Sequence, residues 1–263
     1  MSTKIAQMAG LKLIEGYSSS SDDDDDDVSR PETVDKKINL NSLPLPKFAP
    51  VGTGVEHYET IVDNPEEHDG RVRSFKHERG NWATLVYADY KPSEALQSWM
   101  TSVNTIIPAG TLILNDSHLS FSRTLILKYH WIESFVESLR DLTRSTPKFN
   151  LQITNVKIYC NEGRTRTFLG LECQCLDQTV THYMTSLNKL LSEYQLPPFY
   201  EDASYHISFL WLLGDKEEDL KKLIPTLNES LFDILSKHFE NSYINIEHIH
   251  CKVGNKLYKW PLR

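Results

Sequence analysis

The sequence of 263 residues predicts an α+β fold of two lobes that are related by a pseudo-twofold axis. A strand, helix, strand, helix alternation occurs twice between residues 82 and 239. The third segment of each set carries the same tetrapeptide pattern, His-[Leu/Ile]-Ser-Phe. Each lobe is expected to be an antiparallel sheet with helices, and the two lobes are expected to face each other across a cleft.

Charge separates an N-terminal segment from the rest of the chain. Residues 1–69 contain 15 acidic and 6 basic side chains, whereas residues 70–263 contain 21 acidic and 22 basic side chains. Ser18 to Ser21 precede the six aspartates Asp22 to Asp27, which is typical of a disordered acidic tail. We therefore expect a tail over residues 1–69 and a folded domain over 70–263. Its lobes are expected over about 70–150 and 151–263, and strands near the chain ends are free to exchange between them.

The first set of elements begins with the β-branched and aromatic run Trp82–Tyr87, which predicts a strand. Ser93 follows a proline and is expected to cap a helix. The short alternating segment His118–Ser122 predicts the next strand. Apolar residues recur at helical spacing within Trp131–Leu142, which predicts a helix with one buried face.

The second set has the same order. Ile153–Tyr159 and Thr167–Cys173 predict two strands, and Asp177 is placed to cap a helix that ends before Pro197. Tyr205–Leu213 predicts another strand.

The C-terminal segment completes the predicted fold. A helix is expected from Asp215 toward Phe239. Ile244–His250 and Lys256–Trp260 predict two strands, and Gly254-Asn255 between them suits a tight hairpin turn.

The tetrapeptides His118-Leu119-Ser120-Phe121 and His206-Ile207-Ser208-Phe209 are the candidate functional motifs. In a strand, residues two apart share a face, so each histidine projects together with its serine. The intervening apolar residues turn the other way and are expected to fill the core. If the lobes face each other, two imidazoles and two hydroxyls converge in the cleft.

Such a set suits acid–base chemistry on a phosphodiester. One neutral imidazole takes a proton from a nucleophile, and one protonated imidazole gives a proton to a leaving oxygen. The two hydroxyls can donate hydrogen bonds to the phosphate oxygens. RNA supplies a nucleophile of its own, the 2′-hydroxyl. No metal and no cofactor are expected for this chemistry.

Other interpretations of the motifs are weaker. A single histidine on a half-buried strand is usually a packing residue, but a repeated motif favours a functional pair. A catalytic zinc site usually has three protein ligands, and the motif spacing fixes only two. Neither motif serine lies in a G-x-S-x-G turn, which argues against a Ser-His-Asp triad.

Composition narrows the protein class further. Apolar runs such as Phe209–Leu213 are too short to span a bilayer, and no secretory signal is evident. Few cysteines argue against a disulfide framework and favour reduced, structural thiols in an intracellular protein. These cysteines are Cys160, Cys173, Cys175 and Cys251.

The paired motifs resemble the two-histidine (2H) phosphoesterase superfamily. Within it, further segments are similar to the U6 small nuclear RNA phosphodiesterase family: Gly70–Thr84, Lys157–Tyr159, Arg164–Phe168, Phe199-Tyr200 and Cys251–Lys256. This resemblance implies a nuclear 3′-to-5′ exoribonuclease that needs no metal and trims the 3′ oligouridine tail of U6 small nuclear RNA. Attack by the 2′-hydroxyl would leave a 2′,3′-cyclic phosphate, which some members open to a phosphomonoester.

The resemblance also implies roles for individual residues. His118 and His206 form the acid–base pair, and Ser120 and Ser208 hold the phosphate. Tyr200 stacks on the terminal base. The implied substrate-binding set is completed by Leu119, Glu162, Asp202, Ser204, Tyr205 and Ile207.

Several alternatives stay open at this point. The near-symmetric motifs do not say which histidine is the acid and which the base. Two other functions also fit the motifs: a 2′,3′-cyclic phosphodiesterase that acts on other RNA or nucleotides, and a nucleotide-binding module without catalysis. The expected partner is the single-stranded, uridine-rich 3′ end of U6 small nuclear RNA, and a monomer in the nucleus is expected.

Overall fold

The computed structural model describes residues 78–200 and 204–263. The expected tail over residues 1–69, and Asp202 of the expected site, lie outside the described residues. The elements are, in chain order, β1 (Asn81–Asp89), α2 (Glu94–Ile106), β2 (Thr111–Leu112), β3 (His118–Ser120), β4 (Leu125–Lys128), the 3₁₀ turn η2 (Tyr129–Trp131), α3 (Ile132–Ser145), β5 (Phe149–Cys160), β6 (Arg166–Cys175), α4 (Thr179–Glu193), β7 (Tyr205–Leu213), α5 (Glu217–Lys221), α6 (Ile224–Lys237), the 3₁₀ turn η3 (Phe239–Ser242), β8 (Tyr243–Ile246), β9 (His248–Val253) and β10 (Lys256–Pro261).

The described strands form one ten-stranded sheet with the order β10-β9-β1-β3-β7-β6-β5-β8, in which β2 also pairs with β7 and β4 with β1. The strand pairs are antiparallel throughout. β3 and β7 meet in the middle of the sheet, where Leu119 lies opposite Ile207. Both tetrapeptide motifs therefore lie at the junction between the two halves of the sheet. The α+β class with an antiparallel sheet is confirmed.

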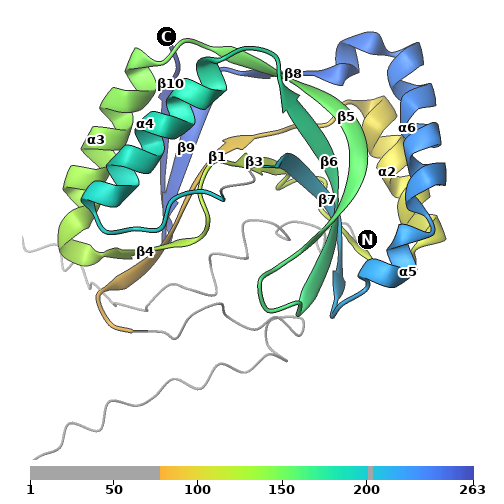
Figure 1. Cartoon of the computed structure of the whole chain (residues 1–263), viewed down its shortest axis with the longest axis horizontal. Coiled ribbons are helices and arrows are strands. Elements are labelled where there is room, and N and C mark those ends of the chain that lie inside the picture. The colour runs from red at the N-terminus through yellow and green to blue at the C-terminus, as the bar shows by residue number, and fades with distance from the viewer. Residues whose placement is uncertain (1–77, 201–203) are drawn as a thin grey trace, which may run out of the picture. The chain divides into compact units, whose positions relative to one another are not determined.

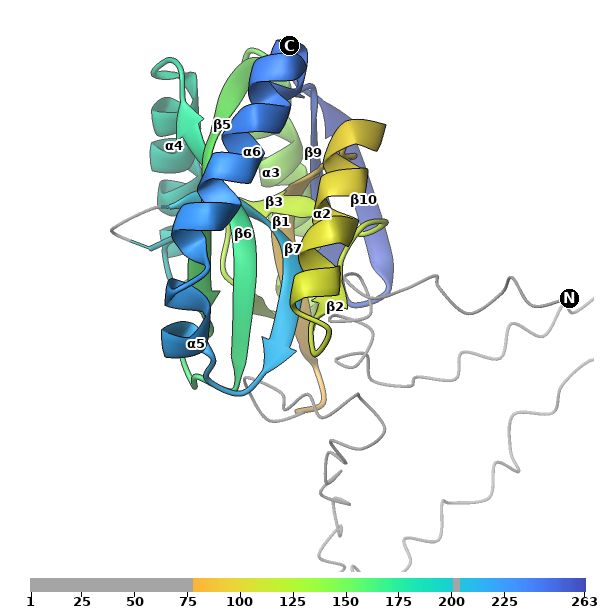
Figure 2. The ribbon, with the colours of Figure 1, turned by 90° about the vertical axis from the view of Figure 1, so that its right-hand side faces the viewer.

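Each half of the sheet has its own helices (Figures 1 and 2). α3 packs against α4 and contacts β9 and β10, whereas α2 packs against α6, and α5 and α6 contact β5. We propose that the half with β10, β9, β1, β3 and β4 and the half with β2, β7, β6, β5 and β8 are the two lobes. The lobes exchange elements along the chain, because α2 follows β1 and α4 follows β6, yet each packs with helices of the other half.

The predicted elements are present in the predicted order, but two of them, one helix and one strand, are each divided into two. The helix expected after Asp215 is divided into α5 and α6, and Pro225 occupies the first turn of α6, where its missing N–H costs nothing. The strand expected over Ile244–His250 breaks at Glu247. β8 before the break pairs with β5, whereas β9 after it pairs with β1.

Local signals are confirmed at the start of α2 and at the β9–β10 turn, whereas the N-cap residue of α4 is Gln178 and Asp177 lies one residue before it. Ser93 caps α2, and its hydroxyl accepts a hydrogen bond from the Leu96 N–H. The Asp177 carboxylate accepts a hydrogen bond from the N–H of Thr179 at the start of α4, at 2.6 Å. Gly254 has a φ of +54° in the turn between β9 and β10, a backbone conformation that favours glycine.

The apolar residues of both motifs lie in the core, as predicted. Leu119, Phe121, Ile207 and Phe209 have no exposed side-chain surface. The four cysteines are free thiols. No helix within the described residues is long and apolar enough to cross a membrane.

Candidate active site

The two motifs line one cavity. Because β3 and β7 are paired, the residues on either side of Leu119 and Ile207 project to the same side of the sheet. A cavity of about 410 Å³ lies there, and its lining includes both motif histidines and both motif serines. The lining consists of Ile113, His118, Ser120, Tyr159, Cys160, Asn161, Glu162, Phe168, Tyr200, Ser204, His206 and Ser208.

Each motif histidine is oriented by a hydrogen bond of the same kind, between its ring and the backbone carbonyl two residues earlier. The Nδ1 atom of His118 lies 2.9 Å from the carbonyl oxygen of Asp116, and Nδ1 of His206 lies 2.8 Å from the carbonyl oxygen of Ser204. A carbonyl only accepts hydrogen bonds, so Nδ1 carries the proton in each ring. The Nε2 atom of each neutral imidazole is therefore left as the base.

Aromatic rings support the two imidazoles. The ring of His206 stacks on that of Tyr159, with 3.7 Å between centroids and 15° between planes. The Tyr159 hydroxyl is hydrogen-bonded to the Ser204 hydroxyl at 2.9 Å. The ring of His118 meets that of Tyr87 edge-on, with centroids 5.3 Å apart. These contacts restrict ring rotation on both sides of the cavity.

Burial lowers the pKa of both histidines. For His118 the loss of hydration is partly offset by the Asp116 carbonyl and by the charge of Asp89. For His206 it is offset by the Ser204 carbonyl, while the nearby positive charge of the other histidine lowers the pKa further. In the free protein at neutral pH both rings are mainly neutral, which suits a base, and the protonated form of either ring is a stronger acid than an ordinary imidazolium.

Three side chains are joined at the mouth of the cavity. The Arg123 guanidinium lies 4.0 Å from the centroid of the Tyr200 ring, and its Nη1 donates to the Glu162 carboxylate at 2.9 Å. Tyr200 is 46% exposed, so its ring is accessible. The structure thus joins Tyr200 and Glu162, two residues predicted for substrate binding, through Arg123. The sequence prediction missed Arg123, and its position just after the first motif is the only local signal for it.

The other predicted residues lie elsewhere around the motifs. Ser204 lines the cavity, whereas Leu119 and Ile207 are buried in the core. The ring of Tyr205 stacks on that of Phe199, with centroids 6.0 Å apart, and does not line this cavity. A substrate contact by Leu119, Tyr205 or Ile207 therefore stays a prediction.

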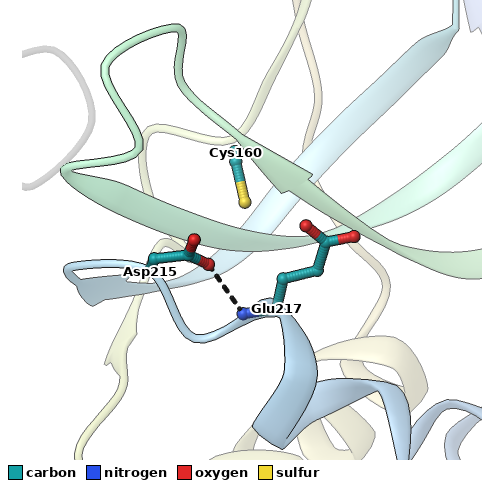
Figure 3. Close-up of side chains that lie close together, drawn as sticks. All are labelled: Cys160, Asp215 and Glu217. Carbon is teal, nitrogen blue, oxygen red and sulfur yellow. Dashed lines mark hydrogen bonds between the residues drawn. The ribbon is translucent and has the colours of Figure 1, made fainter.

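A group of three potential ligand atoms lies between the end of β5 and the start of α5, and one of its residues, Cys160, also lines the catalytic cavity. Cys160, Asp215 and Glu217 each place one such atom within 4.8 Å of the others (Figure 3). The Arg164 guanidinium donates to the carboxylates of both Asp215 and Glu217, at 2.6 Å for Asp215. This cation lowers the pKa of both carboxyls. We therefore assign the group to an arginine bridge that ties the hairpin to the start of α5.

Comparisons with known proteins agree with the motifs. The model of the HVSL family, described as an uncharacterised conserved protein, matches residues 43–261. The chain is 39% identical to "U6 snRNA phosphodiesterase 1" of Danio rerio over 212 residues, which cover 78% of this chain and 75% of that protein. The protein of the same name from Homo sapiens is 32% identical over 245 residues, which cover 89% of this chain and 91% of that protein.

A solved structure, that of Kluyveromyces marxianus Usb1 with uridine monophosphate, superimposes with a TM-score of 0.48 and 15% identity. The match covers 69% of this chain and 97% of that one. The family match and the sequence identities are sufficient without it. They show that this chain belongs to the HVSL family, the family of the U6 small nuclear RNA phosphodiesterases.

Proposed function

We propose that this protein is a 3′-to-5′ exoribonuclease that trims the 3′ oligouridine tail of U6 small nuclear RNA without a metal. The observation that carries the proposal is the convergence of His118, Ser120, His206 and Ser208 in one cavity. Membership of the U6 small nuclear RNA phosphodiesterase family supports the substrate. We further propose that the protein acts in the nucleus, as a monomer.

The reaction begins at the 2′-hydroxyl of the penultimate nucleotide. Nε2 of one neutral histidine removes the hydroxyl proton, and the oxygen attacks the adjacent phosphorus. The bond from phosphorus to the 5′-oxygen of the terminal nucleoside breaks, and the other histidine protonates that oxygen. The products of the first cut are a free nucleoside and an RNA that ends in a 2′,3′-cyclic phosphate; in each later cut the released nucleoside carries the phosphate left by the cut before. Attack by water, with the two proton transfers reversed in direction, would open the ring to a phosphomonoester.

The remaining cavity residues hold the substrate. The hydroxyls of Ser120 and Ser208 donate hydrogen bonds to the non-bridging phosphate oxygens, where negative charge grows in the transition state. Tyr200 stacks on the terminal base, a contact worth about 1–3 kcal/mol per base. Glu162, Ser204 and Asp202 complete the expected nucleoside contacts.

The test uses a short RNA that ends in several uridines with a free 3′ cis-diol, incubated with the protein in EDTA. Mass spectrometry is expected to show a ladder shortened from the 3′ end, with a cyclic or opened phosphate on each product. Intact RNA would contradict the proposal. Opening of 2′,3′-cyclic uridine monophosphate without trimming would instead favour the cyclic phosphodiesterase alternative.

The histidine roles are tested by His118→Ala and His206→Ala. Each variant is expected to lose at least about 10²-fold in trimming rate, the usual contribution of a general acid or base. His182→Ala, at an exposed position on α4, is the matched control and is expected to keep the wild-type rate. Near wild-type trimming by either motif variant would contradict the paired role.

A further inference from the structure

A second cavity, of about 570 Å³, adjoins the catalytic one. Ser204 lines both cavities, and the other residues of the second cavity come from β5, β6 and the start of β7. These residues are Thr154, Asn155, Lys157, Glu172, Cys173, Gln174, Cys175 and Tyr205. We propose that the second cavity binds the nucleotide that carries the attacking 2′-hydroxyl, an inference that rests on the proposed function.

The polar side chains of this cavity continue the sheet face that carries His206. Glu172 lies directly opposite His206 across the β6–β7 pair, and Asn155 lies opposite Glu172 across the β5–β6 pair. Residues opposite each other in an antiparallel pair share a face. Along β5, Tyr159, Lys157 and Asn155 alternate onto this same face. The face therefore leads from the ring that supports His206 directly into the second cavity.

The reaction geometry separates the two nucleosides. In an in-line displacement the attacking and leaving oxygens lie on opposite sides of phosphorus, and the nucleosides that bear them extend away from each other. Of the two cavities, Tyr200 and Glu162 line the first, where the terminal nucleoside is expected, and not the second. The second cavity then offers the adjoining space for the nucleoside on the other side of the phosphate, past Ser204.

The lining suits a base and ribose better than a free phosphate. Lys157 Nζ lies 2.7 Å from the Glu172 carboxylate, so the two charges offset each other. Asn155 donates to the same carboxylate at 3.3 Å, and its carbonyl oxygen is an acceptor. Gln174 offers one more amide at an exposed position. Amides can both donate to and accept from the edge of an unpaired base, and the carboxylate can accept from a ribose hydroxyl.

The test compares two dinucleotide substrates. One is UpU, and the other has a ribose without a base in place of the first uridine, so the attacking 2′-hydroxyl and the terminal uridine are kept. The wild-type protein is expected to show a kcat/KM at least about tenfold higher for UpU, the effect of one stacked or hydrogen-bonded base. In the double variant Asn155→Ala/Gln174→Ala this ratio is expected to fall toward one. Asn245→Ala, an exposed amide on β8 outside both cavities, is the control and is expected to keep the wild-type ratio.

The outcomes separate this inference from the proposed function. If the wild-type protein cuts both dinucleotides equally, or if the double variant keeps the full preference for UpU, the second cavity does not bind this nucleotide, although trimming stands. If neither the dinucleotides nor a longer oligouridylate is cut, the proposed function itself fails and this inference fails with it. Asn155 and Gln174 are exposed, so an unchanged Tm is expected to show that the double variant is folded.

Discussion

The two motif histidines have the same backbone support but different ionic neighbours. His118 lies opposite Asp89 across the β1–β3 pair. A carboxylate oxygen of Asp89 lies 3.1 Å from Nε2 of the buried His250. His206 lies opposite Glu172 across the β6–β7 pair, and a carboxylate oxygen of Glu172 lies 2.7 Å from Nζ of Lys157. Burial lowers the pKa of His250, which favours its neutral form, whereas a lysine keeps its charge. Asp89 therefore keeps more of its negative field than Glu172, and the two motif histidines lie in unequal electrostatic surroundings.

The lowered pKa values of the motif histidines predict the pH dependence of trimming. One ring must be neutral and the other protonated, and both pKa values lie below the ordinary value of 6.5. We expect kcat/KM for a short oligouridylate to peak below pH 6.5 and to fall about tenfold per pH unit above pH 7, as the protonated fraction of the acid declines. A plateau that extends to pH 8 would contradict this prediction.

The lowered pKa values of His118 and His206 also make folding stability depend on pH, so the pH profile of trimming needs a stability control. A histidine whose pKa is lowered by folding binds its proton more readily in the unfolded chain. Folding stability contributed by the two rings is therefore fully present above the unfolded pKa of about 6.5 and is lost as the pH falls below it. Thermal unfolding measured at each pH is needed to separate a loss of folded protein at low pH from a loss of the general base.

The contacts of Arg123 with Tyr200 and Glu162 predict that this side chain contributes to substrate binding. Arg123→Met removes the guanidinium from the Tyr200 ring and the ion pair with Glu162. A cation–π contact at a partly exposed site is worth about 0.5–1 kcal/mol, so we expect KM for oligouridylate to rise about two- to fivefold, with a smaller change in kcat. Arg140→Met, at another ion-paired surface arginine, is the control. An unchanged KM in Arg123→Met would show that Tyr200 binds without this support.

At the scale of elements, patterns within a strand were predictable and pairings between strands were not. β7 has the predicted bounds, Tyr205–Leu213, because nine consecutive residues carry a strong β signal. The two-residue β2 and the four-residue β4 were missed, because they are too short to show a period. The motif spacing predicted a shared face for each His-Ser pair, but the register that sets Leu119 opposite Ile207 depends on tertiary packing.

The pairing of β6 with its neighbours makes Gly170 a sensitive position. A Cβ atom added there would lie 2.9 Å from the Tyr159 ring and 3.3 Å from the His206 ring. We expect Gly170→Ala to displace this stacked pair and to lower kcat/KM for trimming about tenfold or more, since small misplacements of reacting groups are costly. Gly163→Ala, whose added Cβ would meet only a methyl group of Thr165 at 3.7 Å, is the control. Equal rates for the two variants would show that the stack tolerates the shift.

At the scale of the whole molecule, contacts around the cavity were predictable only where the residues are close in sequence. The four motif side chains line one cavity, as expected, because each His-Ser pair lies within one strand. Their catalytic roles stay a prediction. Arg123 was missed because its contacts with Glu162 and Tyr200 join segments that are distant along the chain. The exchange of α2 and α4 between the halves was missed for the same reason, because helix amphipathicity shows which face is buried but not against which sheet.

The uneven charge of the chain predicts a salt-dependent effect of residues 1–69 on RNA binding. This segment has a net charge of −9, whereas residues 70–263 have a net charge of +1. The two motifs and the described cavity lining belong to the folded sheet and its connecting loops, so removal of 1–69 is expected to leave kcat unchanged. KM for RNA is expected to fall about threefold at low salt and to be unchanged at about 0.5 M salt, where the repulsion is screened.

A full-length chain with Asp22 to Asp27 replaced by asparagine isolates charge from length. If repulsion is the cause, this variant shows the same direction of change at low salt, in proportion to the six charges removed. A truncated chain that loses kcat at every salt concentration, with an unchanged Tm, would contradict the prediction. That result would place part of the catalytic requirement within residues 1–69, because neither screening nor unfolding would explain it.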